Sequence, residues 1–274
     1  MMSCSGPPAC TPTTSARAVA FVLLLSVPGV AGCQLGRGEL AGRGSDQWTR
    51  TYTLQDGGEF QIVGAVGAIE IQGGDASTVD VQAERIVRSS SDALAKEAVS
   101  RIRITEDVAP NQVVLRNDGL GGIVVGVDVA VNFHVTVPRA TRLRLRTAGG
   151  DITVANVNGA VVASTTNGSI TGTALGGGVE ARSTNGTVTI DLAAVGQDPV
   201  ELRATNGAVT LTLPRSANAN LDASCTNGSI DIADVPLQVT GEQSARKTRG
   251  RLNVGGAPIA LTTTNGNIKV RPRP

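Results

Sequence analysis

The sequence has few of the large side chains from which a thick hydrophobic core is built. Aromatic residues make up 2% of its 274 residues, and it contains two methionines and one histidine. Glycine is abundant at 34 residues, and valine, isoleucine, threonine, alanine and asparagine are frequent. Such a chain can fill a narrow core with β-branched residues, which fit a pleated sheet. The composition therefore predicts thin, all-β packing rather than an α/β layer architecture.

The shortage of histidine and cysteine restricts the chemistry available to the protein. Because His134 is the single histidine, no histidine-rich metal site can form. It lies in an alternating segment, opposite the apolar Phe133, so we expect it to face solvent. We predict no catalytic residue, no metal and no cofactor, and hence a protein that is not an enzyme.

Three of the four cysteines lie near the N-terminus. Residues 1–32 carry one charge, Arg17, and the apolar run from Ala18 to Ala31 is short for a membrane span. It ends in Val30-Ala31-Gly32-Cys33, which resembles the lipobox of bacterial lipoproteins. The resemblance implies a signal peptide over residues 1–32, cleavage before Cys33, and acylation of Cys33 as a membrane anchor. An ordinary secretory signal with an incidental cysteine and an uncleaved membrane anchor are the alternatives.

Cleavage at that position has consequences for the mature chain. Cys4 and Cys10 would be lost and Cys33 acylated, which leaves Cys225 as a lone thiol and excludes an intramolecular disulfide. The 24 basic and 23 acidic residues nearly balance, so we expect no nucleic-acid partner. Residues 33–46 are rich in glycine and are predicted to form a flexible tether. The resemblance implies a cell-envelope location, in the outer membrane where the organism has two membranes, because Gln34 follows the cysteine.

An internal repeat dominates the rest of the sequence. The pattern Thr-Asn-Gly-x-Ile/Val occurs five times, with spacings of 18, 21, 21 and 38 residues between its asparagines. These asparagines are Asn167, Asn185, Asn206, Asn227 and Asn265. Aligned on them, apolar residues recur at alternate positions on both sides of the Asn-Gly pair, with polar residues between. Period-two alternation on either side of a fixed corner predicts one strand entering and one strand leaving.

Two folds are compatible with such a corner. Asn-Gly between alternating strands is also a hairpin signal. The recurrence of the same side chains every 18 to 21 residues instead favours stacked coils, in which equivalent residues lie one strand spacing apart. We therefore predict an all-β, single-domain parallel β-solenoid, or β-helix, over residues 47–274, with its repeat core at 142–271.

The pattern also predicts where the coils lie and where they are interrupted. We expect one coil near 57–72, a run of coils from 142 to 233, and a last coil at 257–271. Strands at 78–87, 102–108, 113–117 and 127–138, with a short helix at 92–99 after a serine N-cap, are predicted as insertions near the N-terminal end. Residues 237–254 are predicted to form a hairpin excursion before the last coil. Pro272 and Pro274 are expected to block further pairing at the solenoid's end.

These motifs carry a family resemblance. The Thr-Asn-Gly-x-Ile/Val repeats, Val135-Thr-Val-Pro138 with Leu143-x-Leu145, and the Gly255-Gly256-Ala-Pro-Ile approach to the last coil resemble the bacterial putative-adhesin β-strand-repeat family, a domain of unknown function. The resemblance covers roughly residues 50–271. It implies a β-solenoid exposed in the cell envelope.

Two sets of polar columns are candidates for a site. The asparagines are predicted to turn inward and form an amide ladder between coils, with a ligand track as the alternative. Outside, Glu180, Glu201 and Asp222 are predicted to stack in one column beside Arg182 and Arg203. We interpret these charges as a solvated, salt-paired face, and a surface for acidic sugars is the alternative. Cys225 falls in a column of small core residues and is not expected to be a nucleophile.

The sequence favours a non-enzymatic envelope lipoprotein that displays a rigid solenoid for adhesion or protein–protein interaction. Its expected partners are the membrane, through the lipid anchor, and an unidentified envelope protein or glycan. A carbohydrate-active β-helix protein that binds or cleaves acidic polysaccharide is one alternative, and an envelope sensor or regulatory partner is another.

Overall fold

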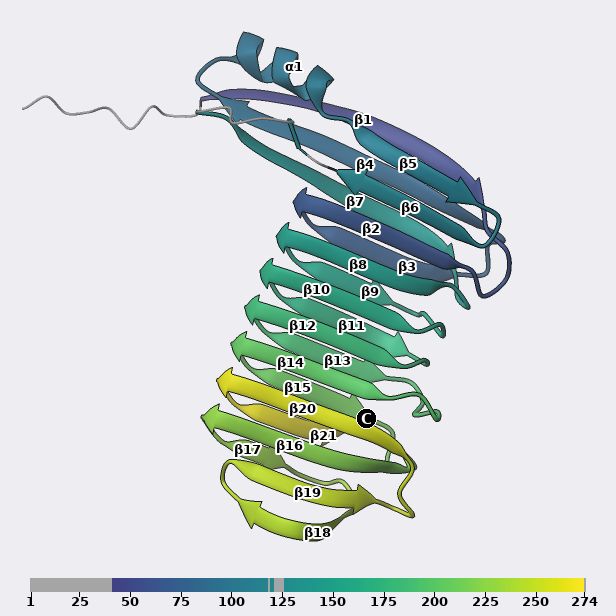
Figure 1. The fold of residues 1–274 in the computed structure, drawn as a ribbon, viewed down its shortest axis with the longest axis vertical. Coiled ribbons are helices and arrows are strands. Elements are labelled where there is room, and N and C mark those ends of the chain that lie inside the picture. The colour runs from purple at the N-terminus through teal and green to yellow at the C-terminus, as the bar shows by residue number, and fades with distance from the viewer. Residues whose placement is uncertain (1–40, 118, 121–125, 274) are drawn as a thin grey trace, which may run out of the picture. The chain divides into compact units, whose positions relative to one another are not determined.

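The computed structural model describes residues 41–117, 119–120 and 126–273 of the chain (Figure 1). The predicted signal peptide, Cys33 and most of the predicted tether lie outside these ranges. Within them, no helix has the length and apolar character needed to cross a membrane. The predicted all-β parallel solenoid is confirmed: the strands form two large sheets, one of ten strands and one of eleven.

The described residues form 21 strands and one helix. In chain order they are β1 (Gly42–Thr53), β2 (Glu59–Val66), β3 (Ile69–Gly74), β4 (Thr78–Ser89), α1 (Asp92–Arg101), β5 (Ile104–Ala109), β6 (Gln112–Asn117), β7 (Asp128–Pro138), β8 (Arg142–Gly149), β9 (Ile152–Ala155), β10 (Val161–Asn167), β11 (Ile170–Leu175), β12 (Val179–Asn185), β13 (Val188–Leu192), β14 (Val200–Asn206), β15 (Val209–Leu213), β16 (Ala219–Asn227), β17 (Ile230–Ile232), β18 (Leu237–Ser244), β19 (Lys247–Leu252), β20 (Ala257–Asn265) and β21 (Ile268–Pro272).

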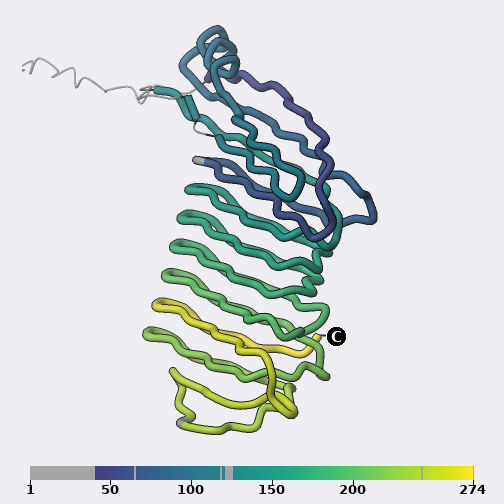
Figure 2. The backbone as a smooth tube through the Cα atoms, turned by 45° about the vertical axis from the view of Figure 1, so that its right-hand side comes forward, coloured from purple at the N-terminus to yellow at the C-terminus, as the bar shows by residue number. Residues whose placement is uncertain are grey.

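Each coil of the solenoid, called a rung below, contributes one strand to each sheet (Figures 1 and 2). The first sheet has the order β1-β4-β7-β3-β9-β11-β13-β15-β21-β17, and the second has the order β18-β19-β16-β20-β14-β12-β10-β8-β2-β6-β5. Neighbouring rungs pair in parallel and in the register expected from the repeat: Val179 pairs with Val161 and Val200, and Asn185 with Asn167 and Asn206.

The core lies between the two sheets and is narrow. The inward columns of the repeats are valine, isoleucine, leucine and alanine, and most of these side chains are almost fully buried. The two largest fully buried side chains of the described residues, Phe60 and Phe133, lie on β2 and β7, at the N-terminal end. A stack of β-branched side chains therefore replaces the thick aromatic core that this composition excludes.

The N-terminal end of the stack is closed by antiparallel strands and the helix. β4 pairs antiparallel with both β7 and β1, and β5 pairs antiparallel with β6. The predicted helix is confirmed: the Ser91 side chain caps α1 by accepting a hydrogen bond from the Leu94 amide at 3.3 Å. Tyr52 on β1 donates a 2.6 Å hydrogen bond to Glu106 on β5, and burial together with this bond raises the pKa of its phenol.

The tether prediction is wrong at its C-terminal boundary. Residues 42–46 belong to β1, whose whole length is in register with β4. Gly42 and Gly44 lie against the backbone of Ser91 and Ala95, where a side chain would collide with α1. Their role is therefore close packing of strand and helix, and the glycine content of this segment does not indicate flexibility.

The order of the rungs differs from the sequence at the C-terminal end. β20 lies between β14 and β16, and β21 lies between β15 and β17, so the last rung in the chain is the penultimate rung in space (Figure 2). Pro272 pairs with Leu213 inside this arrangement, so it does not end the solenoid as predicted, and Pro274 lies outside the described residues. The predicted hairpin is confirmed as β18–β19, and it extends the second sheet by pairing β19 with β16.

Candidate functional site

The Thr-Asn-Gly corners stack directly on one another. At four of the five corners the glycine N–H donates to the asparagine carbonyl of the next rung, as from Gly168 to Asn185 at 3.0 Å and from Gly186 to Asn206 at 3.1 Å. A Cβ atom on Gly186 would overlap the carbonyl of Gly168. The corners therefore form a continuous column of backbone with no room for a side chain at the glycine positions.

Buried hydroxyl groups support this column from inside. Thr165, Ser183 and Thr263 each donate a hydrogen bond, of 2.8 to 3.1 Å, to the carbonyl of a corner glycine on an adjacent rung. Ala204 and Cys225 occupy the same inward column without a hydroxyl. Cys225 is buried as predicted, and burial raises the pKa of its thiol, which disfavours the thiolate that a nucleophile requires.

The asparagines face solvent, so their predicted inward orientation is wrong. The alternation of the entering strand ends at the corner, and both Thr184 and Asn185 are exposed. Their amides nevertheless form a ladder, with Nδ2-to-Oδ1 distances of 2.7 to 2.9 Å. The order along the ladder is Asn167, Asn185, Asn206, Asn265 and Asn227. Each of the three interior amides therefore donates one hydrogen bond and accepts one within the ladder.

Replacement of Asn206 by alanine tests the ladder. The change removes its amide bonds to Asn185 and Asn265, and because both are exposed we expect a loss of about 0.5–1.5 kcal/mol in the free energy of unfolding. Thermal unfolding followed by circular dichroism measures it, with Asn218→Ala, an exposed asparagine in the loop before β16, as control. Equal melting temperatures for the two variants would contradict a structural role for the ladder.

The charged columns on the second sheet are paired with each other. Arg182 contacts Glu180 at 2.9 Å and Glu201 at 3.1 Å, and Arg203 contacts Glu201 at 2.7 Å. The predicted carboxylate column is interrupted, because Ala260 lies between Glu201 and Asp222. Mutual pairing leaves few of these charges for an acidic sugar, and exposed pairs of this kind stabilise little.

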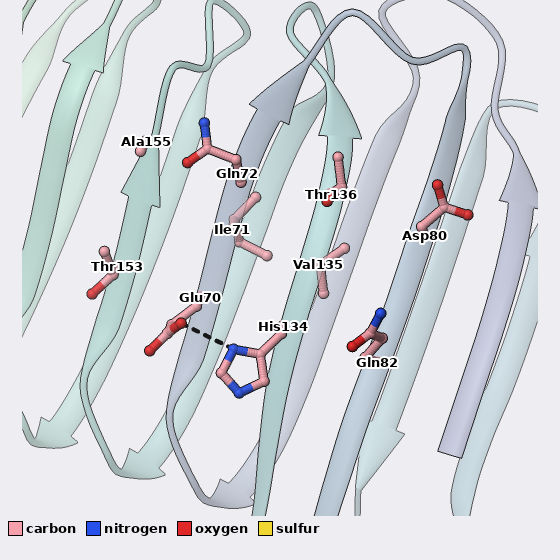
Figure 3. A pocket seen from close by; sticks show the side chains of 10 residues that line it. All are labelled: Glu70, Ile71, Gln72, Asp80, Gln82, His134, Val135, Thr136, Thr153 and Ala155. Carbon is pink, nitrogen blue, oxygen red and sulfur yellow. Dashed lines mark hydrogen bonds and ion pairs between the residues drawn. The ribbon is translucent and has the colours of Figure 1, made fainter. Parts of the chain in front are cut away.

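A groove lies on the outer face of the first sheet, where the parallel rungs meet the antiparallel cap (Figure 3). Its volume is about 310 Å³. The side chains form two rows across β4, β7, β3 and β9: Gln82, His134, Glu70 and Thr153 in one, and Asp80, Thr136, Gln72 and Ala155 in the other. All of them except Ala155 can form hydrogen bonds.

His134 lies at the centre of this groove and faces solvent, as predicted. Its Nδ1 atom is 2.9 Å from Glu70 Oε2. Asp80 accepts a hydrogen bond from Thr51 at 2.7 Å. A second hollow of about 620 Å³ shares Asp80, Gln82 and Thr136 with the groove and extends it over β1. Of these residues, only His134 was singled out from the sequence: Glu70, Gln72 and Thr153 occupy outward positions of the repeat, and Asp80, Gln82 and Thr136 lie on strands outside it.

The described part of the chain contains no cluster of three or more histidine, cysteine, aspartate or glutamate residues that could hold a metal ion. The Glu70–His134 pair lies beside amide and hydroxyl groups. Among the side chains that line the groove, none is a nucleophile activated by a neighbouring base. The arrangement can bind a polar ligand through hydrogen bonds.

Comparison with known proteins identifies the family. The chain belongs to the Toastrack DUF4097 family, whose model matches residues 58–271, and the resemblance inferred from the repeats is thereby confirmed. No curated protein matches the chain in sequence.

Solved structures are similar to this chain to different degrees. One is a "putative cell adhesion protein" from Clostridium sporogenes, 13% identical, with a TM-score of 0.54 over 84% of this chain and 100% of that one. A "putative adhesin" from Bacteroides fragilis is 11% identical, with a TM-score of 0.32 over 83% of this chain and 97% of the other. At these identities the likeness of the first concerns the fold alone.

Proposed function

We propose that the protein is a non-enzymatic lipoprotein of the cell envelope that displays its solenoid for adhesion. The observation that carries this proposal is the polar groove on a rigid, regularly paired face, which offers hydrogen-bonding groups without the constellation of a catalytic centre. Stacked rungs provide extended binding surfaces of this kind. The adhesion-related name of a protein with the same fold agrees with it.

The anchor is inferred from Val30-Ala31-Gly32-Cys33. The first described strand begins at Gly42, so few residues separate Cys33 from the folded domain. The solenoid would therefore be held close to the membrane surface, where its N-terminal cap is the part nearest to the anchor in sequence.

Lipidation at Cys33 is tested by labelling bacterial cells with radioactive palmitate. We expect the protein to incorporate label and the Cys33→Ser variant to incorporate none, because the variant lacks the thiol that would be acylated. The Cys225→Ser variant is the matched control and should label normally, since that thiol is buried. Equal labelling of the protein and Cys33→Ser would exclude the anchor.

Adhesion itself is measured separately, as the attachment of producing and deletion strains to surfaces coated with host or neighbouring-cell material. We expect attachment to fall in the deletion strain and to return on complementation. Unchanged attachment across all surfaces would contradict an adhesive role even if Cys33 is acylated.

A further inference from the structure

We propose that the groove centred on His134, together with the adjoining hollow over β1, binds a neutral oligosaccharide. This inference rests on the proposed adhesive function and names its ligand class. The polar groups that line the groove are amides, hydroxyl groups, two carboxylates and one imidazole (Figure 3), and the adjoining hollow adds the guanidinium of Arg50.

The pattern of these groups suits a chain of hydroxyl-bearing units. Gln72 and Gln82 each offer a donor and an acceptor, Thr136 and Thr153 offer hydroxyl groups that do both, and Glu70 accepts. Because neighbouring strands lie roughly 4.8 Å apart, a ligand that crosses the strands meets a new pair of such groups at every strand. Sugar hydroxyl groups likewise donate and accept, so each can be matched by this lining.

The combined length of the groove and the adjoining hollow favours an oligosaccharide over a single sugar. The groove and the hollow share Asp80, Gln82 and Thr136, and together they extend from Thr49 on β1 to Thr153 on β9. This path crosses β1, β4, β7, β3 and β9, which are consecutive neighbours in the first sheet. A ligand lying along it would contact both the antiparallel cap and the first parallel rungs.

The charge of the lining selects against acidic glycans. Glu70 and Asp80 place two carboxylates in the groove, and His134 already contacts Glu70. Arg50 lines the adjoining hollow, but it lies over the Trp48 ring at 5.0 Å and its guanidinium is paired with Glu106 at 3.4 Å. An anionic sugar would therefore meet the like charges of Glu70 and Asp80 beside an arginine that is already paired, which disfavours its binding.

A peptide is a weaker candidate for this groove. The strands beneath the groove, β4, β7, β3 and β9, are each paired on both sides, so their backbone groups are not available for strand addition; β1, beneath the adjoining hollow, is the edge strand of the sheet. The outward side chains also lack the aromatic and arginine anchors that dominate protein–protein interfaces. Hydrogen bonds to the polar side chains are the main interactions that remain.

Affinity electrophoresis of the full-length protein in detergent tests the proposal. The gels contain dextran, mannan or chitin oligosaccharides as neutral probes, and polygalacturonate as the acidic probe. We expect at least one neutral probe to retard the protein and the acidic probe to leave its mobility unchanged. Gln82→Ala should weaken the retardation about tenfold, the effect of one lost hydrogen bond of typical strength.

A pair of isosteric variants separates the groove from the rest of the face. Thr153→Val removes a hydroxyl group inside the groove, whereas Thr189→Val removes one from an equivalent exposed position two rungs away on the same sheet. Neither change disturbs the core, since both side chains face outward. We expect Thr153→Val to weaken retardation about tenfold and Thr189→Val to leave it unchanged.

Three results would overturn the glycan site: no retardation by any neutral probe, retardation by polygalacturonate alone, or equal retardation of both threonine variants. Binding of a fluorescent peptide library that none of the glycans displaces would assign the groove to peptides and would also overturn the glycan site. None of these results would affect the palmitate or attachment experiments, so a failed ligand class remains distinguishable from a failed adhesive function.

Discussion

Replacement of Gly186 by alanine is expected to destabilise the protein by about 3 kcal/mol or more. The new methyl group would overlap the carbonyl of Gly168, and neither rung can retreat, because backbone hydrogen bonds join each corner to the next. The φ angle of Gly186, +156°, adds strain for a residue with a side chain. Chemical denaturation followed by circular dichroism measures the change in the free energy of unfolding.

Gly196 provides the matched control. A Cβ atom there would have no neighbour within 4 Å, and the residue lies in an exposed loop before β14. Gly196→Ala should be neutral or stabilise by up to about 1 kcal/mol, since alanine restricts the unfolded chain. Unfolding of the two variants at the same denaturant concentration would contradict the close packing of the backbone at the corner.

Replacement of Val188 by aspartate is the second change with a large expected effect. Val188 is fully buried on β13, between Ile170 and Val209 on the neighbouring strands. A carboxylate there would lie in the narrow apolar core without a partner, and we expect the free energy of unfolding to fall by about 3–5 kcal/mol. The midpoint of thermal or chemical unfolding reports it.

The adjacent residue supplies the control for this variant. Thr189 points to the outer face of the same strand and is exposed, so Thr189→Asp introduces the same charge into solvent. Its effect should stay under about 1 kcal/mol. A larger loss for Thr189→Asp than for Val188→Asp would reverse the assignment of inner and outer faces.

The parallel stack could be predicted because two separate features of the sequence define its columns. The spacing of the repeats fixes which residues lie side by side, and the alternation within each repeat fixes which of them point inward, so Val161, Val179 and Val200 pair as expected. The hairpin and the capped helix could be predicted from local signals, such as Ser91 before an apolar helical pattern.

The remaining features depend on interactions that the repeat does not encode. The rung containing Asn265 matches the columns of every other rung, so nothing local places it between Asn206 and Asn227. The outward orientation of the asparagines follows from the turn of the chain at Thr184 and Asn185, which the alternation of a straight strand does not describe. The groove joins residues from Asp80 to Thr153 through the antiparallel cap, and no motif relates them.

The position of the C-terminal rung has a consequence for the time at which the protein completes its fold. Most repeat proteins can add each unit to the one before it as the chain emerges. Here the contact between Asn206 and Asn265 closes a separation of 59 residues, against 18 to 21 for the preceding rungs. Until β20 and β21 are synthesised, β14 and β16 lack β20 as the strand between them, and β15 and β17 lack β21. Joining of these rungs therefore waits for a long-range closure, which is slow compared with local pairing, and translation of β20 and β21 sets the earliest moment at which both sheets become continuous.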